Sequence, residues 1–493
     1  MRIEHFRIRS LIRKYDVKAG KFIVNISYET APPKPSERVV GVAEAFGLGL
    51  DKWRKFVLYD NVELKIGPRD IVYITGDSGS GKSVLLQALE RDLREAGFTC
   101  ANIADIKPIE GKPIVETVGK TLDEALRLLS LVGLNDAFLF LRNYEHLSDG
   151  QKYRYKIAKL IESKAQWWIL DEFASTLDRD TAKIVAYNLQ KTARKLGRAV
   201  LAATTHTDLL EDLAPSVHIH KRFGKEITVR YYPNKPAEEC SITKEMRIEE
   251  GAYEDWKQLA EHHYRSHRIG NVRKIFRLMR NNELCGVIVY SYPPPISAGR
   301  KQAIGKISTS ELNRLLSTIT RVVIHPKYRG IGLGAKLVRE TLPKAGTPYV
   351  ELTAVMAKYN PFAEKAGMKK ILERKPPKEA LKITETLTKL GFNPHLLTSK
   401  KYASAKLKSL SQREIDKIKN AFAENPHIRF KKELTHGKLY GGTNKEYKQK
   451  IKEANIEKLT KLIEVCGILM QTKTYLLWKD NGKINLGLDC SQK

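Results

Sequence analysis

The stretch Gly76-Asp-Ser-Gly-Ser-Gly-Lys82-Ser83 decides the fold of the first half of the chain. An apolar run at residues 70–75 indicates a buried strand before it, and residues 84–89 indicate a helix after it. The glycines let successive backbone N–H groups point at phosphate oxygens, while Lys82 reaches the β- and γ-phosphates of a nucleotide and Ser83 offers a hydroxyl to Mg²⁺. The stretch therefore predicts a P-loop; the alternative is a flexible glycine turn.

The charge of the chain limits its partners. Its 493 residues contain 87 Lys and Arg against 56 Asp and Glu, a formal net charge of +31. Such an excess favours polyanions because their binding releases counterions, so we expect a nucleic-acid partner, RNA above all. The alternative is a lysine-rich surface of the kind that accompanies growth at high temperature. The length suggests about three domains.

Cysteines and apolar runs indicate the compartment. The five cysteines are scattered without a C-x-x-C pair, so we expect no disulfide framework, no cysteine-bound metal and a reducing compartment. The first residues lack the apolar core of a signal peptide, and no run approaches the roughly 20 apolar residues of a membrane span. We expect a soluble, cytoplasmic protein without a membrane partner.

The segment Leu147-Ser-Asp-Gly-Gln151 is a second sign of nucleotide binding. It leads into a predicted helix at residues 152–161, so the Ser148 hydroxyl and the Gly150 N–H lie at a helix start, where they can bind a γ-phosphate. Taken alone, the segment is equally consistent with an ordinary serine N-cap.

Two carboxylates follow the apolar run Trp167-Trp-Ile-Leu. We expect Asp171 to hold Mg²⁺ and Glu172 to polarise the water that attacks the nucleotide. The segment Ala174-Ser-Thr-Leu-Asp178 comes next, and a predicted strand at residues 199–205 ends just before His206.

These motifs, in this order, resemble those of ABC-type ATPases, with Asp149 in place of the first glycine of their signature L-S-G-G-Q. The resemblance implies ATP and Mg²⁺ as ligands and a head-to-tail homodimer with ATP, since one chain carries one P-loop and one signature. The expected Q-loop glutamine is missing after residues 99–105, which together with the fused domains argues against a transporter. The implied residues are Gly76, Asp77, Ser78, Gly79, Ser80, Gly81, Lys82, Ser83, Ser148, Gly150, Gln151 and Asp178 for ATP, Ser83 and Asp171 for the metal, and Glu172 and His206 for catalysis.

A new pattern begins after a proline-rich linker at residues 231–236. We expect a helix at 253–264 and then a hairpin with strands at 274–279 and 284–290. Residues 321–340 indicate a strand, a basic glycine loop and a helix. The glycines in Arg329-Gly-Ile-Gly-Leu-Gly334 let N–H donors approach a pyrophosphate, although dinucleotide-binding loops share this pattern.

This glycine loop resembles motif A of the GNAT acetyltransferases, and Asn360-Pro-Phe-Ala-Glu-Lys-Ala-Gly-Met368 resembles the end of their motif B. The resemblance implies acetyl-CoA as the cofactor. The residues it implies for acetyl-CoA binding are Val323, Ile324, Arg329, Gly330, Ile331, Gly332, Leu333, Gly334, Asn360 and Phe362.

Three residues are candidates for catalysis of acetyl transfer. Many GNAT enzymes use a tyrosine where this chain has Ala363, and Tyr359, one helical turn earlier, is a substitute if the helix aims it inward. Glu351 and His325 are candidate bases, each with a structural alternative. Direct attack of a neutral amine on the thioester also proceeds without a strong base.

Residues 376–493 are expected to be mainly helical and basic. A capping box at Ser411-Gln-Arg-Glu414 opens one helix, further helices lie within 446–470, and a strand closes the region at 474–478. The region contains 24 Lys and Arg against 12 Asp and Glu, a net charge of +12. Residues 399–408 and 429–432 mix basic and aromatic side chains as nucleic-acid surfaces do; the alternative is a solvated helix face.

The predicted fold is an α/β multidomain chain. It has an N-terminal extension (1–55) with a strand at 22–28, an ABC-type nucleotide-binding domain (56–235), a GNAT α+β acetyltransferase domain (240–375) and the helical C-terminal region (376–493). We expect the nucleotide-binding domain to begin with strands at 56–59 and 62–66, joined by an Asp60-Asn61 turn. The preferred function is ATP-dependent acetyl transfer to an amine of structured RNA. The alternatives are a nucleic-acid- or ribosome-associated motor with a non-catalytic acetyl-CoA sensor, and a protein N-acetyltransferase.

Overall fold

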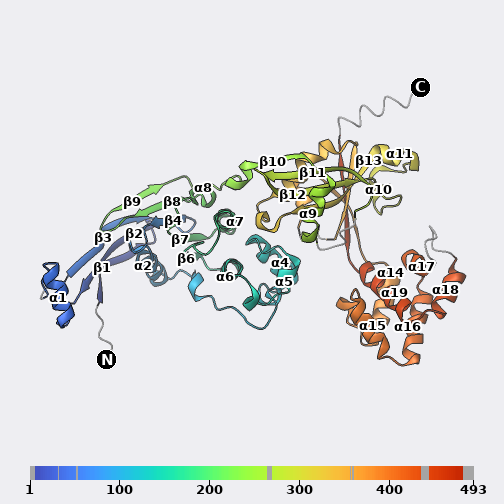
Figure 1. Cartoon of the computed structure of the whole chain (residues 1–493), viewed down its shortest axis with the longest axis horizontal. Coiled ribbons are helices and arrows are strands. Elements are labelled where there is room, and N and C mark those ends of the chain that lie inside the picture. Colours follow the sequence, from blue (N-terminus) through green and yellow to red (C-terminus); the bar gives the residue numbers. More distant parts are fainter. Residues whose placement is uncertain are drawn as a thin grey trace, which may run out of the picture. The chain divides into compact units, whose positions relative to one another are not determined.

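The computed structural model describes residues 6–31, 33–50, 54–263, 269–355, 357, 360–434 and 443–480 (Figure 1). The chain divides into two compact units. The first comprises Met1–Ile269, Ile275–Val289 and Arg321–Leu337, and the second comprises Gly270–Lys274, Tyr290–Thr320 and Val338–Lys493. The finer domain limits given above stay a prediction.

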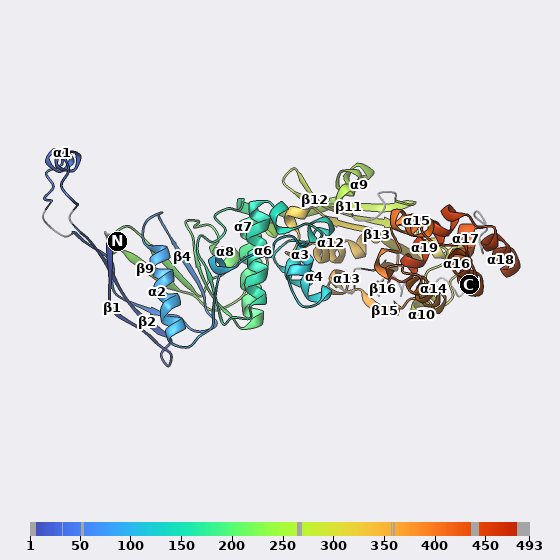
Figure 2. The same ribbon diagram turned by 90° about the horizontal axis from the view of Figure 1, so that it is seen from below.

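An antiparallel sheet of three strands opens the first unit. It consists of β1 (Phe6–Asp16), β2 (Lys21–Thr30) and β3 (Arg54–Lys65), and α1 (Glu37–Ala45) lies in the connection beyond the strand ends (Figure 2). The predicted turn at Asp60-Asn61 is wrong, because β3 runs through it. Val24 pairs with Val62 and Ile26 with Tyr59, so Asp60 and Asn61 form a bulge opposite one residue of β2.

The apolar runs around the P-loop form a six-stranded sheet in the order β5-β6-β7-β4-β8-β9. All neighbouring strands are parallel except β9, which is antiparallel to β8. Because the strands are parallel, their carboxyl ends meet at one edge. The strands are β4 (Ile71–Gly76), β5 (Cys100–Asn102), β6 (Trp167–Leu170), β7 (Ala199–Ala203), β8 (Val217–Lys221) and β9 (Ile227–Tyr231).

Alternate side chains of this sheet enter two separate apolar clusters. Val72 and Ile74 of β4 pack with α2 (Lys82–Glu95) and with the three-stranded sheet, whereas Ile71 and Tyr73 pack with the other helices. Burial on both faces explains why the strands are continuous apolar runs. The other helices are α3 (Ile114–Thr117), α4 (Leu122–Leu131), α5 (Ala137–Phe140), α6 (Asp149–Glu162), α7 (Arg179–Leu196) and α8 (Leu210–Leu213).

A seven-stranded sheet has the order β10-β11-β12-β13-β14-β16-β15. Its β13 and β14 are parallel, whereas β10 is antiparallel to β11, and β16 is antiparallel to both β14 and β15. The predicted hairpin is confirmed as β11 and β12, with Asn281 at a left-handed φ of 52° in the turn. The strands are β10 (Met246–Glu250), β11 (Val272–Arg280), β12 (Glu283–Ser291), β13 (Leu316–Ile324), β14 (Tyr349–Ala354), β15 (Lys369–Arg374) and β16 (Lys473–Lys479).

Short helices connect these strands. The helix predicted at 253–264 is shorter than expected: α9 ends at Leu259 and continues as a 3-10 turn to His262. The helices are α9 (Tyr253–Leu259), α10 (Arg300–Ile304), α11 (Thr309–Leu315), α12 (Leu333–Thr341) and α13 (Phe362–Lys365). The 3-10 helices within the described residues are η1 (Ile103–Asp105), η2 (Tyr144–His146), η3 (Ser241–Glu245), η4 (Ala260–His262), η5 (Pro326–Tyr328), η6 (Leu342–Ala345) and η8 (Pro394–Leu396).

The prediction of a mainly helical C-terminal region is confirmed. Its helices share one apolar core and form one group in both views (Figures 1 and 2). The predicted capping box at Ser411 is present. β16 lies in the sheet between β14 and β15, so the helices are an insertion between two strands of one sheet. They are α14 (Lys378–Lys389), α15 (Lys400–Lys408), α16 (Gln412–Glu424), α17 (Ile428–Leu434), α18 (Asn444–Lys452) and α19 (Ile456–Leu469).

None of the helices within the described ranges has both the length and the apolar character that a bilayer crossing needs.

Candidate functional site

The predicted P-loop connects β4 to α2. Gly76, Gly79 and Gly81 have φ values of 141°, 75° and 99°, which favour glycine. A Cβ on Gly76 would lie 1.9 Å from the carbonyl oxygen of Lys221, so no side chain fits there. α2 begins at Lys82 and directs its N-terminal amides toward the loop.

Lys82 and Ser83 place the two groups that a nucleotide and its metal require. The buried Lys82 ammonium donates to the carbonyl oxygens of Gly76 at 2.9 Å and Asp77 at 2.6 Å. Burial lowers its pKa, against the opposing effect of the Asp77 and Asp171 carboxylates. Ser83 Oγ donates to Asp171 Oδ1 at 3.1 Å. The structure thus brings together the hydroxyl and the carboxylate predicted to share Mg²⁺.

Glu172 lies directly after Asp171 at the carboxyl edge of the sheet. Its backbone N–H donates to Asp171 Oδ1 at 2.9 Å, and its φ of 49° is a left-handed value rare for a residue with a side chain. The side chain is exposed. A carboxylate held beside the metal position and open to solvent fits the predicted role of aligning water.

Among the buried polar atoms without a hydrogen-bond partner in the described residues, two belong to the predicted ATP site: Ser80 Oγ of the P-loop and Nε2 of His206. His206 follows β7, which pairs with the P-loop strand β4. Burial, together with the positive charge of Arg179, lowers the pKa of His206, so its imidazole is neutral at neutral pH. Buried polar atoms are normally satisfied, and these two fit a phosphate-bearing ligand at the loop.

The signature segment caps α6. Gln151 N–H donates to Ser148 Oγ at 3.4 Å and Ser148 N–H donates to Gln151 Oε1 at 3.1 Å, which makes a capping box. The serine N-cap that the sequence offered as an alternative is therefore present. The Ser148 hydroxyl still has its own proton to donate to a phosphate. The Asp149 side chain is 88% exposed.

Asp178 also forms a cap, because its carboxylate accepts from Thr181 N–H at 3.1 Å at the start of α7. Its predicted contact with ATP stays a prediction, as does that of Gln151.

Comparison with known proteins covers only part of the chain. No protein-family model matches it. The methionine import ATP-binding protein MetN 1 of Lactiplantibacillus plantarum is 28% identical over 194 residues, 32% of this chain and 54% of that protein. MetN of Mesorhizobium japonicum is 29% identical over 199 residues, 32% of this chain and 53% of that protein. The chain spans about half the length of these curated relatives.

Solved structures include a dimeric post-hydrolysis state of the ATP-binding cassette MJ0796 bound to ADP and Pi, at 18% identity and a TM-score of 0.31 over 36% of this chain and 92% of that chain. Another is cbiO1 from Clostridium perfringens, part of the ABC transporter complex cbiONQ, with a TM-score of 0.30 over 36% of this chain and 82% of that chain. Because these scores are low, the assignment rests on the motifs and the sequence similarity. This third of the chain is an ABC-type nucleotide-binding domain.

A second candidate site is the glycine loop between β13 and α12, which none of these relatives identifies. Gly330 and Gly332 have φ values of 96° and 89°, so both need glycine. A Cβ on Gly332 would meet nothing within 4 Å, which leaves space for a ligand to approach the backbone. Val323, Ile331 and Leu333 are buried, so any contact they make with acetyl-CoA is through the backbone. Asn360 and Phe362 belong to the second unit.

Arg329 faces the nucleotide-binding domain within the first unit. Its guanidinium donates to the carbonyl oxygens of Ile324 at 2.8 Å, Asn135 at 3.1 Å and His262 at 3.2 Å. Three carbonyls engage this side chain, and burial lowers its pKa. Its predicted contact with acetyl-CoA stays a prediction.

Glu351 is fully satisfied within the second unit. It is 1% exposed and makes a bidentate pair with Arg300, Nε to Oε2 at 3.1 Å and Nη2 to Oε1 at 2.7 Å. Thr318 Oγ1 donates to Oε1 at 2.8 Å and Tyr475 OH to Oε2 at 2.9 Å. This arrangement favours the structural alternative for Glu351 over the role of a base.

His325 caps the short η5 at the end of β13, where its Nδ1 accepts from Lys327 N–H at 3.4 Å. Burial and the neighbouring His262, at 5.1 Å between ring centroids, keep the pKa of His325 low. A neutral imidazole is compatible with a base, and that role stays a prediction. Tyr359, the third candidate, lies outside the described residues.

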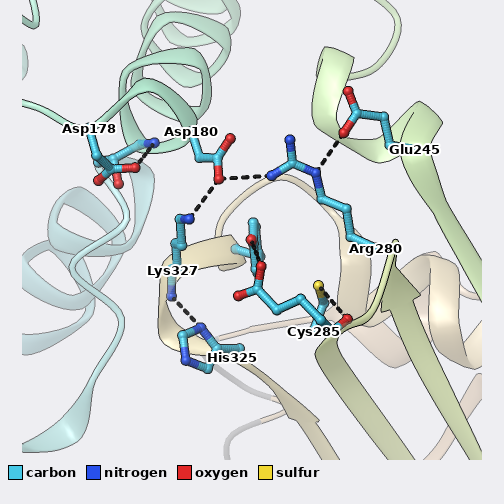
Figure 3. A network of polar contacts seen from close by, with 10 residues as sticks. Asp178, Asp180, Glu245, Arg280, Cys285, His325 and Lys327 are labelled. Atoms are coloured by element: carbon cyan, nitrogen blue, oxygen red, sulfur yellow. Dashed lines mark hydrogen bonds and ion pairs between the residues drawn. The ribbon is translucent and has the colours of Figure 1, made fainter.

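Sequence analysis missed an ion-pair network in the first unit. Asp180 accepts from Arg280 at 2.8 Å and from Lys327 at 2.6 Å, and Arg280 Nε donates to Glu245 at 2.6 Å (Figure 3). These residues lie far apart in the sequence and belong to no motif, so no local pattern pairs them. The one local signal is that Lys327 precedes the glycine loop by a few residues.

Proposed function

We propose that the chain hydrolyses ATP as a head-to-tail dimer and transfers the acetyl group of acetyl-CoA to an amine of structured RNA. The observation that best supports the ATPase part is the 3.1 Å hydrogen bond between Ser83 Oγ and Asp171 Oδ1, because it joins the two predicted Mg²⁺ ligands from distant segments. The relatives are named as methionine import proteins. Since the chain spans only about half of them, we do not extend that role to it.

In the proposed ATP site each residue has one task. Lys82 neutralises the β- and γ-phosphates, Ser83 and Asp171 hold Mg²⁺, and Glu172 aligns the attacking water. His206 contacts the γ-phosphate from the adjacent strand. Ser148 and Gly150 of the second copy donate to the same phosphate and complete the site.

In the proposed acetyl-transfer site the glycine loop binds the pyrophosphate of acetyl-CoA. The open space at Gly332 and the start of α12 supply close backbone approach and a favourable dipole. The acceptor amine attacks the thioester carbon, the new C–N bond replaces the C–S bond, and coenzyme A leaves as the thiolate. The proton that the amine loses passes through solvent to this thiolate, so coenzyme A is released as the thiol. Positioning supplies most of the rate when no strong base is present.

Nucleic acid is the proposed acceptor because of charge. The net charge of +31 for the whole chain, and of +12 for residues 376–493, favours phosphate backbones over neutral substrates.

A second candidate is an ABC-type nucleic-acid- or ribosome-associated motor that uses the acetyl-CoA fold only as a sensor. The engagement of Glu351 by Arg300, Thr318 and Tyr475 favours it, because that carboxylate has no oxygen left for a substrate proton. Ala363, which replaces the usual tyrosine, favours it too.

The test is incubation with radiolabelled acetyl-CoA, ATP–Mg²⁺ and cellular RNA or protein. We expect label on RNA, and loss of that label in Gly332→Asp with ATPase activity retained. Label on protein alone would support a protein N-acetyltransferase. Binding of acetyl-CoA without label on either polymer would support the sensor.

A further inference from the structure

The start of α7 connects the nucleotide-binding domain to the rest of the first unit. Asp178 ends the segment 174–178, which in the proposed dimer lies beside the ATP site, and its carboxylate caps α7. Asp180 is in the first turn of the same helix. Asp178 and Asp180 therefore lie at the same capped helix end.

Asp180 binds two cations that come from outside the nucleotide-binding domain. Arg280 is the last residue of β11 and Lys327 lies in η5, just before the glycine loop; Figure 3 shows Asp180 between them. The side chains of Asp180 and Arg280 are only 19% and 16% exposed, so solvent screens this pair weakly. Burial opposes ionisation of Asp180, but its bonds to Lys327 and Arg280 outweigh that effect and lower its pKa.

A second contact joins the glycine loop to the same domain. Arg329 donates to the Asn135 carbonyl oxygen at 3.1 Å, and a Cβ on Gly330 would lie 3.1 Å from Asn188 Nδ2 of α7. A small cavity beside this contact is lined by Gln151 and Arg154 of the signature helix α6 and by Lys327 and Arg329. The starts of α6 and α7, both predicted to contact ATP, thus face the segment that leads into the glycine loop.

We infer that the ATP and acetyl-CoA sites are coupled through Asp180, so that closing the ATP dimer repositions the segment at Lys327 and Arg329 and raises the affinity for acetyl-CoA. This rests on the proposed function of both sites. The open state is the ATP-free monomer and the closed state is the ATP dimer. Lys327 is held by Asp180 and Arg329 by the Asn135 carbonyl, so a movement of these partners moves the segment that leads into the glycine loop. The coupling is reciprocal, so acetyl-CoA strengthens ATP binding by the same factor.

The test measures the dissociation constant of acetyl-CoA by calorimetry on the full chain carrying Glu172→Gln, with and without ATP–Mg²⁺. We expect ATP to tighten acetyl-CoA binding by about tenfold, within the range usual for coupled sites. Adding Asp180→Asn should abolish that difference and leave the nucleotide-free affinity for acetyl-CoA unchanged. Lys327→Gln should reduce the effect of ATP on acetyl-CoA affinity. Circular dichroism will show whether Asp180→Asn folds, and Lys327→Gln replaces it if it does not.

Asp60→Asn is the matched control, because it removes an Asp–Lys pair of 3.0 Å with Lys225 outside this network. It should keep the tenfold effect. Equal acetyl-CoA affinity with and without ATP, when both ligands bind, would overturn the coupling and leave the proposed function standing. Absence of acetyl-CoA binding in both states would overturn the coupling together with the proposed acetyl-CoA site.

Discussion

Glu172 is the residue on which ATP hydrolysis depends. In Glu172→Gln the amide can no longer accept a proton or orient water as a carboxylate does, so we expect turnover to fall by about a hundredfold or more while ATP binding persists. Phosphate release and calorimetry measure the two quantities. Lys82→Ala should instead weaken binding itself. An unchanged hydrolysis rate in Glu172→Gln would remove Glu172 from its assigned role.

Arg300 carries a prediction about stability. Arg300→Ala leaves the Glu351 carboxylate buried without its cation, and breaking such a pair typically costs about 3–5 kcal/mol of unfolding free energy. Urea denaturation measures this cost. Lys370→Ala is the control, since it removes an exposed pair with Glu373 and should cost about 1 kcal/mol or less. A loss below about 1 kcal/mol in Arg300→Ala would mean that the pair contributes little.

For single residues, the sequence predicts the contacts that form between neighbours along the chain. The P-loop residues follow one another along the chain, and strand, glycines and helix together restrict their geometry, so their placement could be derived. Asp180, Arg280 and Lys327 meet only after the chain has folded. The same holds for Glu351, because Tyr475 reaches it from 124 positions away.

Among the helices, α15 and α17 carry the basic clusters predicted to bind RNA. Their aromatic residues do not form a stacking surface: Phe430 is fully buried and Tyr402 packs against Phe392 in the core. What remains exposed is charge, which binds phosphates without reading bases. Recognition by these helices should therefore be electrostatic and largely independent of sequence.

The salt dependence of RNA binding tests this. Replacing exposed Lys401, Lys408, Arg429 and Lys432 by glutamine should reduce the slope of log affinity against log salt concentration by about one for each phosphate contact removed. Filter binding over a salt series measures the slope. Lys55→Gln, at an exposed lysine of β3, is the control. Affinity that ignores both salt and the four substitutions would leave these helices as solvated faces.

The strands were predicted best where both faces of the sheet are buried. β4, β6 and β7 are continuous apolar runs and were placed within a residue or two. The error at Asp60-Asn61 has a tertiary cause, because pairing with β2 converts a turn sequence into a bulge. Pairing also explains why residues 473–479, which end a helical region, belong to a sheet that begins more than 200 residues earlier.

For the whole molecule the prediction concerns assembly. One P-loop and one signature per chain require a second copy to complete each site, so ATP–Mg²⁺ should drive dimerisation of Glu172→Gln and the dimer should dissociate after hydrolysis in the wild type. Light scattering with and without ATP–Mg²⁺ measures this. The exposed Asp149 can turn away from the γ-phosphate, which limits its repulsion. A monomer in both conditions, or normal hydrolysis by Ser148→Arg, would exclude the shared site.

The position of β16 also sets the order in which the chain can fold as it is synthesised. β14 and β15 leave the ribosome first, but β16, the strand that pairs with both, follows only after helices α14–α19, which lie between β15 and β16. Until then two strands present open edges that invite pairing with other chains. A fragment ending after β15 keeps those edges permanently. The helical insertion delays completion of the sheet, and we expect rapid local folding of its helices to shorten the interval in which nascent chains can aggregate.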